Sequence, residues 1–401
     1  MSLGTGVQKN RSDFDQHVAQ ASAALEPRLI ALRRDLHRHP ELAFQEHRTA
    51  ARLVAELEAA GLQPRGGVGG TGVVVDIDGG APGPCILLRA DIDALPIHEA
   101  TGLPFASETP GVMHACGHDL HAAIGAGTAL VMAGIAPRLH GRLRIVFQPA
   151  EEILEGAQAM IDDGVLDGVD MAIGFHNKPD LPVGRFGMVH GATTASSDRF
   201  VVTVRGQGGH TARMHQTRSP IPAVASLALA LPALVPALAD PAVPAILGLG
   251  MIQAGHSHNV VPDTASLSGT LRTRSETVRN TLQAAIARQC RAVALAHDVE
   301  CALDYRRGVC AQVNDAALFV PVRAALRARF GDVIDELPPS MGAEDFALFS
   351  DAVPGFRFHI GSGQPGRSDR VHAPDYQPDE GSIRLGVEAC CGILLELLAR
   401  A

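Results

Sequence analysis

The sequence predicts an α/β protein, a sandwich with a central and mostly parallel sheet that is interrupted by a smaller domain. Up to about residue 174, short apolar runs alternate with helical stretches, and such runs are typical of strands covered on both faces. Between residues 190 and 307 the order becomes strand, helix, strand, strand, helix, strand. Helical and strand-like segments then return, so we interpret the middle part as an insertion.

The first part of the chain begins with two expected helices. Leucines spaced four, three and four residues apart form one apolar stripe within the first forty residues: Leu25, Leu29, Leu32 and Leu36. His39-Pro40 ends this helix, and a second helix is expected from about residue 46 to 60. Apolar runs predict strands at residues 72–77, 85–90, 143–147 and 170–174, with helices near 120–134 and 155–164 between them.

The insertion has the element order of a ferredoxin-like domain. Ser219-Pro220 opens its first helix, because Ser is a good N-cap and Pro suits the first turn. Strands are expected at 198–206, 245–254, 264–273 and 298–305, and a second helix at 275–297. We therefore predict a second domain at 190–307, inserted in a discontinuous first domain made of 1–189 and 308–401. The later part adds a helix near 315–330, a strand at 356–360 and a closing helix at 381–399.

Composition narrows the class of protein. The chain has 401 residues, 46% of them hydrophobic, and a formal net charge of −9 with scattered arginines, which disfavours nucleic-acid and anionic-membrane partners. No apolar stretch is long enough to span a bilayer, and nothing suggests a secretory signal. The seven cysteines follow no repeated spacing, so we expect reduced thiols and a cytoplasmic location.

One glycine-rich segment resembles a nucleotide-binding turn but has the wrong context. Residues 67–72 read GVGGTG, which matches G-x-G-x-x-G. The segment follows a predicted helix and precedes a predicted strand, the reverse of the order in a dinucleotide-binding turn. We therefore predict a turn or hairpin loop there.

The segment at residues 114–121, HACGHDLH, brings one thiol and three imidazoles into eight residues. Cys116 and His118 are two residues apart, so in extended backbone both can point to one side. Thiolate, imidazole and carboxylate are the usual ligands of zinc and similar ions. The segment therefore indicates a metal site, provided that further ligands come from elsewhere.

Further polar residues follow three of the predicted strands: Asp91 and Asp93, Glu151 and Glu152, and His176. One more histidine, His372, stands late in the chain. Sites on α/β sheets are built at such strand ends. Taken singly, each group has an ordinary explanation as a turn, a solvated helix start or a loop histidine. Two adjacent glutamates at a strand end are costly without a neutralising cation, whereas with a metal one can ligate and the other can accept a proton from water. Together, these groups predict a metal-dependent hydrolytic site.

Six motifs in order along the chain resemble the M20 metallopeptidase superfamily, in its amidohydrolase branch of N-acyl-amino-acid, hippurate and auxin-conjugate hydrolases. The resemblance runs from about residue 35 to residue 380. The motifs are RADIDALP at 89–96, HACGHDLH at 114–121, QPAEE at 148–152, GGH at 208–210, HNVVP at 258–262 and MGAEDF at 341–346.

The resemblance implies a catalytic α/β domain that holds two divalent metal ions, and an inserted lid domain that serves in a homodimer. The implied metal ligands are Cys116, His118, Glu152, His176 and His372. The mixed donor set accepts Zn, Mn, Ni or Co.

The resemblance also implies roles beside the metal ions. Glu151 would be the general base, and Asp93 would orient an imidazole ligand. On the lid, His210 would stabilise the oxyanion, from the same or the partner subunit, while Asn259 and Arg272 would hold the carboxylate of the substrate.

The implied reaction is hydrolysis of the amide bond in a small N-acyl amino acid. Two alternatives stay open: a dipeptidase, carboxypeptidase or deacetylase of the same superfamily, and a metal- or ligand-binding module without catalysis. His114 and His121 are alternative ligands. Ala343 and Gln377 depart from the commoner residues of the family and leave the choice of substrate open.

Overall fold

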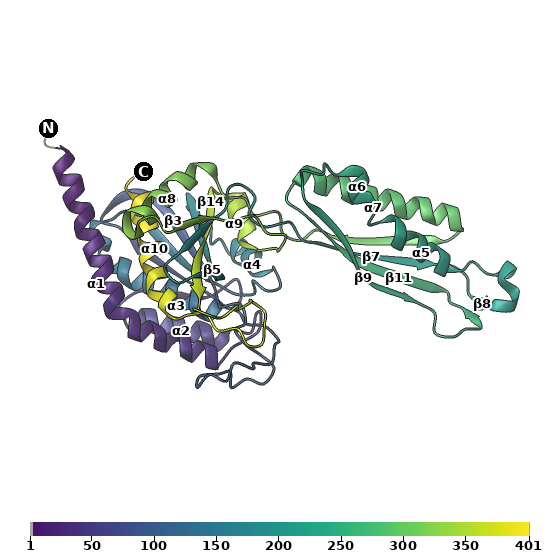
Figure 1. Ribbon diagram of the computed structural model, residues 1–401, viewed down its shortest axis with the longest axis horizontal. Coiled ribbons are helices and arrows are strands. Elements are labelled where there is room, and N and C mark those ends of the chain that lie inside the picture. The colour runs from purple at the N-terminus through teal and green to yellow at the C-terminus, as the bar shows by residue number, and fades with distance from the viewer. Residues whose placement is uncertain (1–2, 401) are drawn as a thin grey trace. The chain divides into compact units, whose positions relative to one another are not determined.

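The computed structural model describes residues 3–400, with side chains from residue 13 onward (Figure 1). The chain forms two compact units. The first contains Met1–Gly191, Val313–Pro338 and Leu348–Ala401, and the second contains Ala192–Gln312 and Pro339–Ala347. The second unit thus includes five residues beyond position 307 and a further short segment near residue 343.

The first unit is built on an eight-stranded sheet in the order β1-β2-β4-β3-β5-β14-β6-β13. The four central strands β4, β3, β5 and β14 are parallel, whereas β1 and β2 pair antiparallel at one side. The strands are β1 (Arg65–Val68), β2 (Gly72–Asp78), β3 (Ala81–Asp91), β4 (His140–Gln148), β5 (Met171–Pro182), β6 (Phe186–Met188), β13 (Ile334–Glu336) and β14 (Gly355–Gly363). The predicted mostly parallel sheet is confirmed, and the glycine-rich segment forms the β1–β2 hairpin.

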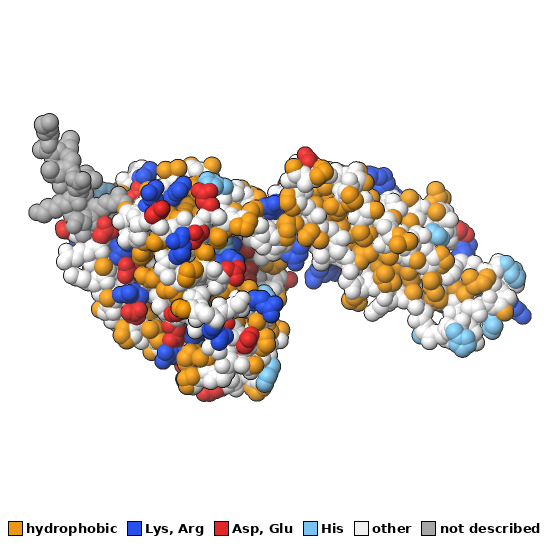
Figure 2. All heavy atoms as spheres, viewed as in Figure 1, with side chains coloured by type: hydrophobic (Ala, Val, Ile, Leu, Met, Phe, Trp, Pro, Cys, Tyr) orange, Lys and Arg blue, Asp and Glu red, His pale blue; other side chains and the backbone are white. Residues whose placement is uncertain are grey.

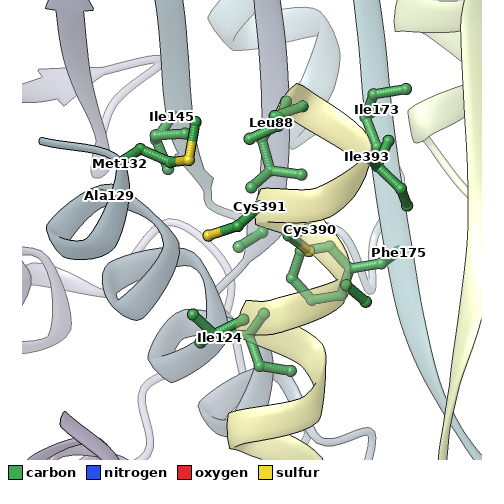
Figure 3. Packing of buried hydrophobic residues seen from close by; sticks show 14 of the residues in the cluster. Leu88, Ile124, Ala129, Met132, Ile145, Ile173, Phe175, Cys390, Cys391 and Ile393 are labelled. Atoms are coloured by element: carbon green, nitrogen blue, oxygen red, sulfur yellow. The ribbon is translucent and has the colours of Figure 1, made fainter. Parts of the chain in front are cut away.

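Three long helices of the first unit, α1 (Leu3–Arg38), α3 (His118–Ala133) and α10 (Gly381–Leu398), pack against one another. A Cβ at Gly127 of α3 would lie 2.6 Å from both Leu29 and Val387, so only glycine allows this close approach. Cys390 and Cys391 are fully buried in the apolar core beside Ile124 (Figure 3). The remaining helices are α2 (His47–Glu58), α4 (Gly156–Asp162), α8 (Ala316–Phe330) and α9 (Phe346–Ala352).

The second unit is the predicted ferredoxin-like domain. Its antiparallel sheet has the order β12-β7-β11-β9 and is covered by α5 and α7, with Ser219 capping α5 as expected. The elements are β7 (Asp198–Arg205), α5 (Pro220–Ala230), β9 (Ala245–Ala254), β11 (Thr264–Thr273), α7 (Glu276–His297) and β12 (Glu300–Arg306). The small additions are β8 (Gly209–His210), β10 (Val260–Val261) and α6 (Leu234–Leu238). Across residues 3–400, no helix has the length and hydropathy that a bilayer crossing requires.

We expect Asp198→Ala to destabilise the second unit strongly. Asp198 is buried and accepts hydrogen bonds from Arg279 Nε at 2.9 Å and Tyr305 Oη at 2.6 Å. Its removal leaves a buried guanidinium without its counter-charge, which costs about 3–5 kcal/mol. The free energy of unfolding of this unit, from hydrogen exchange of the β7 amides, measures the effect. Asp304→Ala, which removes an exposed ion pair with Arg306, is the control and should cost at most about 0.5 kcal/mol; equal losses in both variants would contradict the assignment.

Candidate metal centre

The parallel strands of the first unit end where the predicted site residues stand. Asp91 ends β3, and Glu151 and Glu152 follow β4. The strand expected to stop at residue 174 continues to Pro182, so His176 lies within β5 and not after it. In the parallel pairing of β3 with β5, Arg89 lies opposite Gly174. Two residues further along each strand, His176 is therefore level with Asp91, the end of β3.

A left-handed turn at Gly117 joins Cys116 to His118, the first residue of α3. Gly117 has a φ of 91°, and a Cβ there would lie 2.7 Å from Asn177 Oδ1, so any other residue would be strained and would clash. The Cys116 Sγ then lies 3.5 Å from His176 Nε2. The turn therefore brings the thiol of one segment to the imidazole of another.

Two groups of metal-binding atoms share Cys116. The first group adds His118 and His176, and in each group the donor atoms lie within 4.8 Å of one another. The second group adds Glu152 and His372, whose Oε2 and Nε2 atoms are 3.4 Å apart. Glu151 lies in a further group with His118 and Glu152. All five predicted ligands and the predicted base are therefore brought together.

The residues present fit a metal ion on two grounds. His118 Nε2 and Glu152 Oε1 are buried and have no hydrogen-bond partner within residues 13–400, although they face each other at 3.9 Å. Such atoms cost about 1–3 kcal/mol each when left unsatisfied, and a cation bound between them would satisfy both. One thiol, three imidazoles and a carboxylate are also a suitable donor set for first-row divalent ions.

Asp93 is hydrogen-bonded to the His118 ring, the contact that its predicted orienting role requires. The His118 Nδ1–H donates to the Asp93 carbonyl at 3.0 Å and to its Oδ1 at 3.1 Å. A carbonyl only accepts, so Nδ1 carries a proton, and Nε2 is the nitrogen left to bind a metal. The other Asp93 oxygen accepts the backbone N–H of Glu152 at 3.0 Å, so one carboxylate fixes two proposed ligands.

Two residues at the site have left-handed backbone without being glycine. His372 has a φ of 64°, and its N–H donates to the Ala115 carbonyl at 2.7 Å. Ala150, directly before Glu151, has a φ of 53°, and its N–H donates to Glu46 Oε1 at 2.9 Å. Such conformations cost about 1–3 kcal/mol and persist where surrounding contacts hold them. No motif in the sequence indicates the supporting role of Glu46, which stands 104 residues before Ala150.

Burial shifts the protonation of the donors. It raises the pKa of the Cys116 thiol to about 12. Burial, followed by the neighbouring His121, lowers the pKa of His176 well below its usual value. Near neutral pH, the thiol therefore keeps its proton without a metal, whereas His176 is a neutral ring whose Nε2 lone pair faces the Cys116 thiol.

The two alternative ligands fit less well. His121 uses both ring nitrogens in hydrogen bonds, to Asp91 and to the backbone N–H of Asn177. His114 is fully buried, which lowers its pKa to about 3, but it belongs to none of the donor groups formed by residues 13–400.

The residues predicted on the lid belong to the second unit. His210 and Asn259 stand at the β8–β10 pair, where Thr211 N donates to the Asn259 carbonyl at 3.2 Å. Arg272 lies on β11, and its half-buried guanidinium donates to the Met341 carbonyl at 3.4 Å. Their roles toward a substrate stay predictions.

Residues 87–396 match the model of peptidase family M20/M25/M40. The chain belongs to this family. It is 41% identical over 362 residues to N-acetyl-L-cysteine deacetylase of Bacillus subtilis, covering 90% of this chain and 86% of that one. Among solved structures, a dinuclear metal binding peptidase of the family from Bacillus subtilis has a TM-score of 0.84 at 35% identity, covering 94% of this chain and all of that one. A protein from methicillin resistant Staphylococcus aureus has a TM-score of 0.93 at 31% identity, covering 96% of this chain and 100% of that one. The predicted membership of the amidohydrolase branch is confirmed.

We expect the affinity for a divalent metal to rise with pH. Ligation requires the thiolate, so metal uptake displaces the proton that Cys116 holds up to a pKa of about 12. Each displaced proton raises the apparent affinity about tenfold per pH unit, which gives about 100-fold between pH 6.5 and pH 8.5. Competition with a chelator whose own pH dependence is known measures the apparent metal affinity at each pH. Cys116→Ala should lower the slope by one proton, and an affinity that is the same at both pH values would contradict the expectation.

Proposed function

We propose that this M20-family enzyme hydrolyses the amide bond of N-acyl amino acids, with N-acetylated amino acids such as N-acetylcysteine as the first substrates to test. The observation that carries the proposal is the convergence of Cys116, Glu152 and His372 with the glutamate pair at one sheet edge. The 41% identity to a deacetylase of N-acetyl-L-cysteine supports the choice of acyl group.

We propose two divalent ions as cofactors, one for each donor group. Cys116, His118 and His176 would hold one ion, and Cys116, Glu152 and His372 would hold the other. When bound, the ions acidify water and polarise the carbonyl of the scissile amide. The chemistry of the donor set leaves Zn, Mn, Ni and Co open.

Glu151 moves the proton. It is buried beside Glu152, whose oxygen would be engaged with the metal, so Glu151 is the carboxylate left to accept a proton from the attacking water. The same proton then passes to the amine nitrogen as the carbon–nitrogen bond breaks. The products are a carboxylic acid and a free amino acid.

The lid residues would hold the substrate and the developing charge. The Nδ1 atom of His210 accepts the N–H of Ala212 at 3.1 Å, so the ring proton is on Nε2, which is suited to donate to an oxyanion. Arg272 offers a planar guanidinium, which can grip the carboxylate of an amino acid with two hydrogen bonds. Asn259 would add an amide contact to the same carboxylate.

The main rival function is cleavage of a dipeptide or of a C-terminal residue, which the peptidase character of the family favours. Matched N-acetyl, N-benzoyl and dipeptide substrates, with products identified by mass, separate the two. A binding module without catalysis would have no use for a proton acceptor at Glu151, and it would release no amine from any of these substrates.

We expect Glu151→Gln to keep its metal and to lose about 10²–10⁴-fold in kcat, because the amide cannot accept the proton from water. Metal content and kcat on N-acetylcysteine, measured on the same sample, check this. The control is Glu155→Gln, an exposed glutamate four residues further on, which should retain wild-type kcat. Wild-type turnover in the Glu151 variant would overturn the assignment of the base.

We also propose a homodimer formed through the lid. The ten-residue β9 strand lies at the edge of its sheet, and Ile246, Met251 and Ile252 are about half exposed on it. The adjoining α5 and α6 lie in a stretch, residues 220–239, without one charged side chain. Figure 2 shows hydrophobic side chains gathered over this part of the second unit. A second copy that pairs edge to edge would cover both features with one self-complementary surface.

We expect Ile252→Lys to convert the dimer to a monomer, because each copy would then place a lysine charge within the paired edges. Sedimentation velocity measures the change. Leu295→Lys, at the most exposed large hydrophobic residue on α7, is the matched control and should stay dimeric. A monomeric wild-type protein, or a dimer that only the Leu295 variant breaks, would contradict this interface.

The cysteines support a reducing compartment, for which we propose the cytoplasm. All seven are free, and four of them are buried in the first unit: Cys85, Cys116, Cys390 and Cys391. A ligand role for Cys116 also requires that its thiol stay unoxidised.

A further inference from the structure

A second carboxylate–imidazole pair lies beneath the donor groups, next to the Asp93–His118 pair. Asp91 and His121 are both fully buried, and His121 Nδ1 is hydrogen-bonded to Asp91 Oδ1. Asp91 is also ion-paired with the buried Arg89, whose Nε donates to Gln148 Oε1 at 2.7 Å. This pair has no part in the mechanism described above.

The partners of the His121 ring fix its tautomer. Its Nε2 lies 2.9 Å from the backbone N–H of Asn177, which can only donate. Nε2 therefore carries a lone pair, and the proton is on Nδ1, where it is donated to Asp91. Both nitrogens are thus used within the protein, which leaves the ring without a lone pair for a metal.

The backbone of Asn177 links this pair to a proposed ligand, through the N–H of one peptide group and the carbonyl of the next. The Nδ1–H of His176 donates to the Asn177 carbonyl at 2.7 Å, which directs His176 Nε2 toward Cys116. Asn177 is thus held at its N–H by His121, and its carbonyl in turn holds His176. The ring centroids of His121 and His176 are only 4.7 Å apart, so His121 also limits how the ligand ring can tilt.

We propose that His121, held by Asp91, is a positioning residue that fixes His176 through the backbone of Asn177 and does not itself bind metal. This inference rests on the proposed metal-dependent function. The alternative is that His121, Asp91 and His118 form a metal site of their own, since their donor atoms also lie within 4.8 Å of one another. The hydrogen bonds at both nitrogens of His121 favour positioning.

The test compares His121→Leu with His121→Gln in the full-length protein. Leu removes both hydrogen bonds, whereas Gln offers an acceptor for the Asn177 N–H and a donor for Asp91. With Co²⁺ as the probe, we expect Leu to weaken binding 10–100-fold and to shift the thiolate-to-cobalt absorption, with the number of ions at saturation unchanged. Gln should restore the affinity to within a few-fold of wild type.

The control is Thr128→Val, a buried change further along α3 whose hydroxyl donates to the Ile124 carbonyl at 2.8 Å and is hydrogen-bonded to Cys390 of α10, and which lies outside the donor groups. It should leave cobalt affinity and absorption unchanged, which separates positioning from a general loss of helix stability. One ion fewer at saturation in both His121 variants would make His121 a ligand, and wild-type affinity in the Leu variant would remove any positioning role. Either result overturns the proposal.

The nitrogen-15 shifts of the His121 ring in the wild-type protein give a second readout. We expect an Nδ1-protonated neutral ring, and an Nε2-protonated ring would also overturn the proposal. Neither readout depends on turnover. A wild-type protein that binds Co²⁺ but hydrolyses no substrate would refute the proposed function and still allow this test.

Discussion

Three neighbouring parallel strands, β4, β3 and β5, are in register where β3 and β4 end, and the whole candidate site depends on that register. Asp91 ends β3, Glu151 follows β4, and His176 lies within β5, level with the end of β3. The register therefore brings Asp91, Glu151 and His176 to one place although 85 positions separate the first from the last. A packed sheet then holds the donors more rigidly than loops alone would.

The same edge concentrates buried charge, and each charge has a partner in the protein. Asp91 is paired with Arg89, and on α3 the buried Asp119 is paired with Arg33 at 2.7 Å and with His37 at 2.8 Å. The Arg33 charge and these hydrogen bonds outweigh burial and lower the pKa of Asp119 far below its usual value. These carboxylates are therefore ionised, and each has its counter-charge within the protein. Asp119 uses Oδ2 for both of its contacts, and it belongs to none of the donor groups formed by residues 13–400, unlike His118 and Glu152.

Much of this arrangement could be predicted from the sequence, because hydrophobic periodicity marks buried strands well. The strands at 245–254 and 264–273 have the predicted limits, and Asp91 and the glutamate pair stand at strand ends as expected, whereas His176 lies within a longer strand. The short β6 and β13 were not predicted, because three residues are too few to show a hydrophobic periodicity. Their pairing depends on strands that are distant in the chain. Glu46 and Asn177 were missed for a related reason, because each forms a backbone hydrogen bond with a residue far away in the chain, Glu46 with Ala150 and Asn177 with His121.

The supports of the site are backbone hydrogen bonds more than side-chain contacts, and this explains how it can hold strained residues. Ala150 and His372 occupy left-handed conformations, and each is fixed by its own N–H, to Glu46 and to the Ala115 carbonyl. Glu151 follows the first of these residues, and the second is itself a proposed ligand. Relaxation of either strain would swing a functional side chain out of the cluster. The strained backbone at Ala150 and His372 thus lies directly beside the functional side chains. Hydrogen bonds within the protein hold it in place without a bound ion, so the site is preorganised.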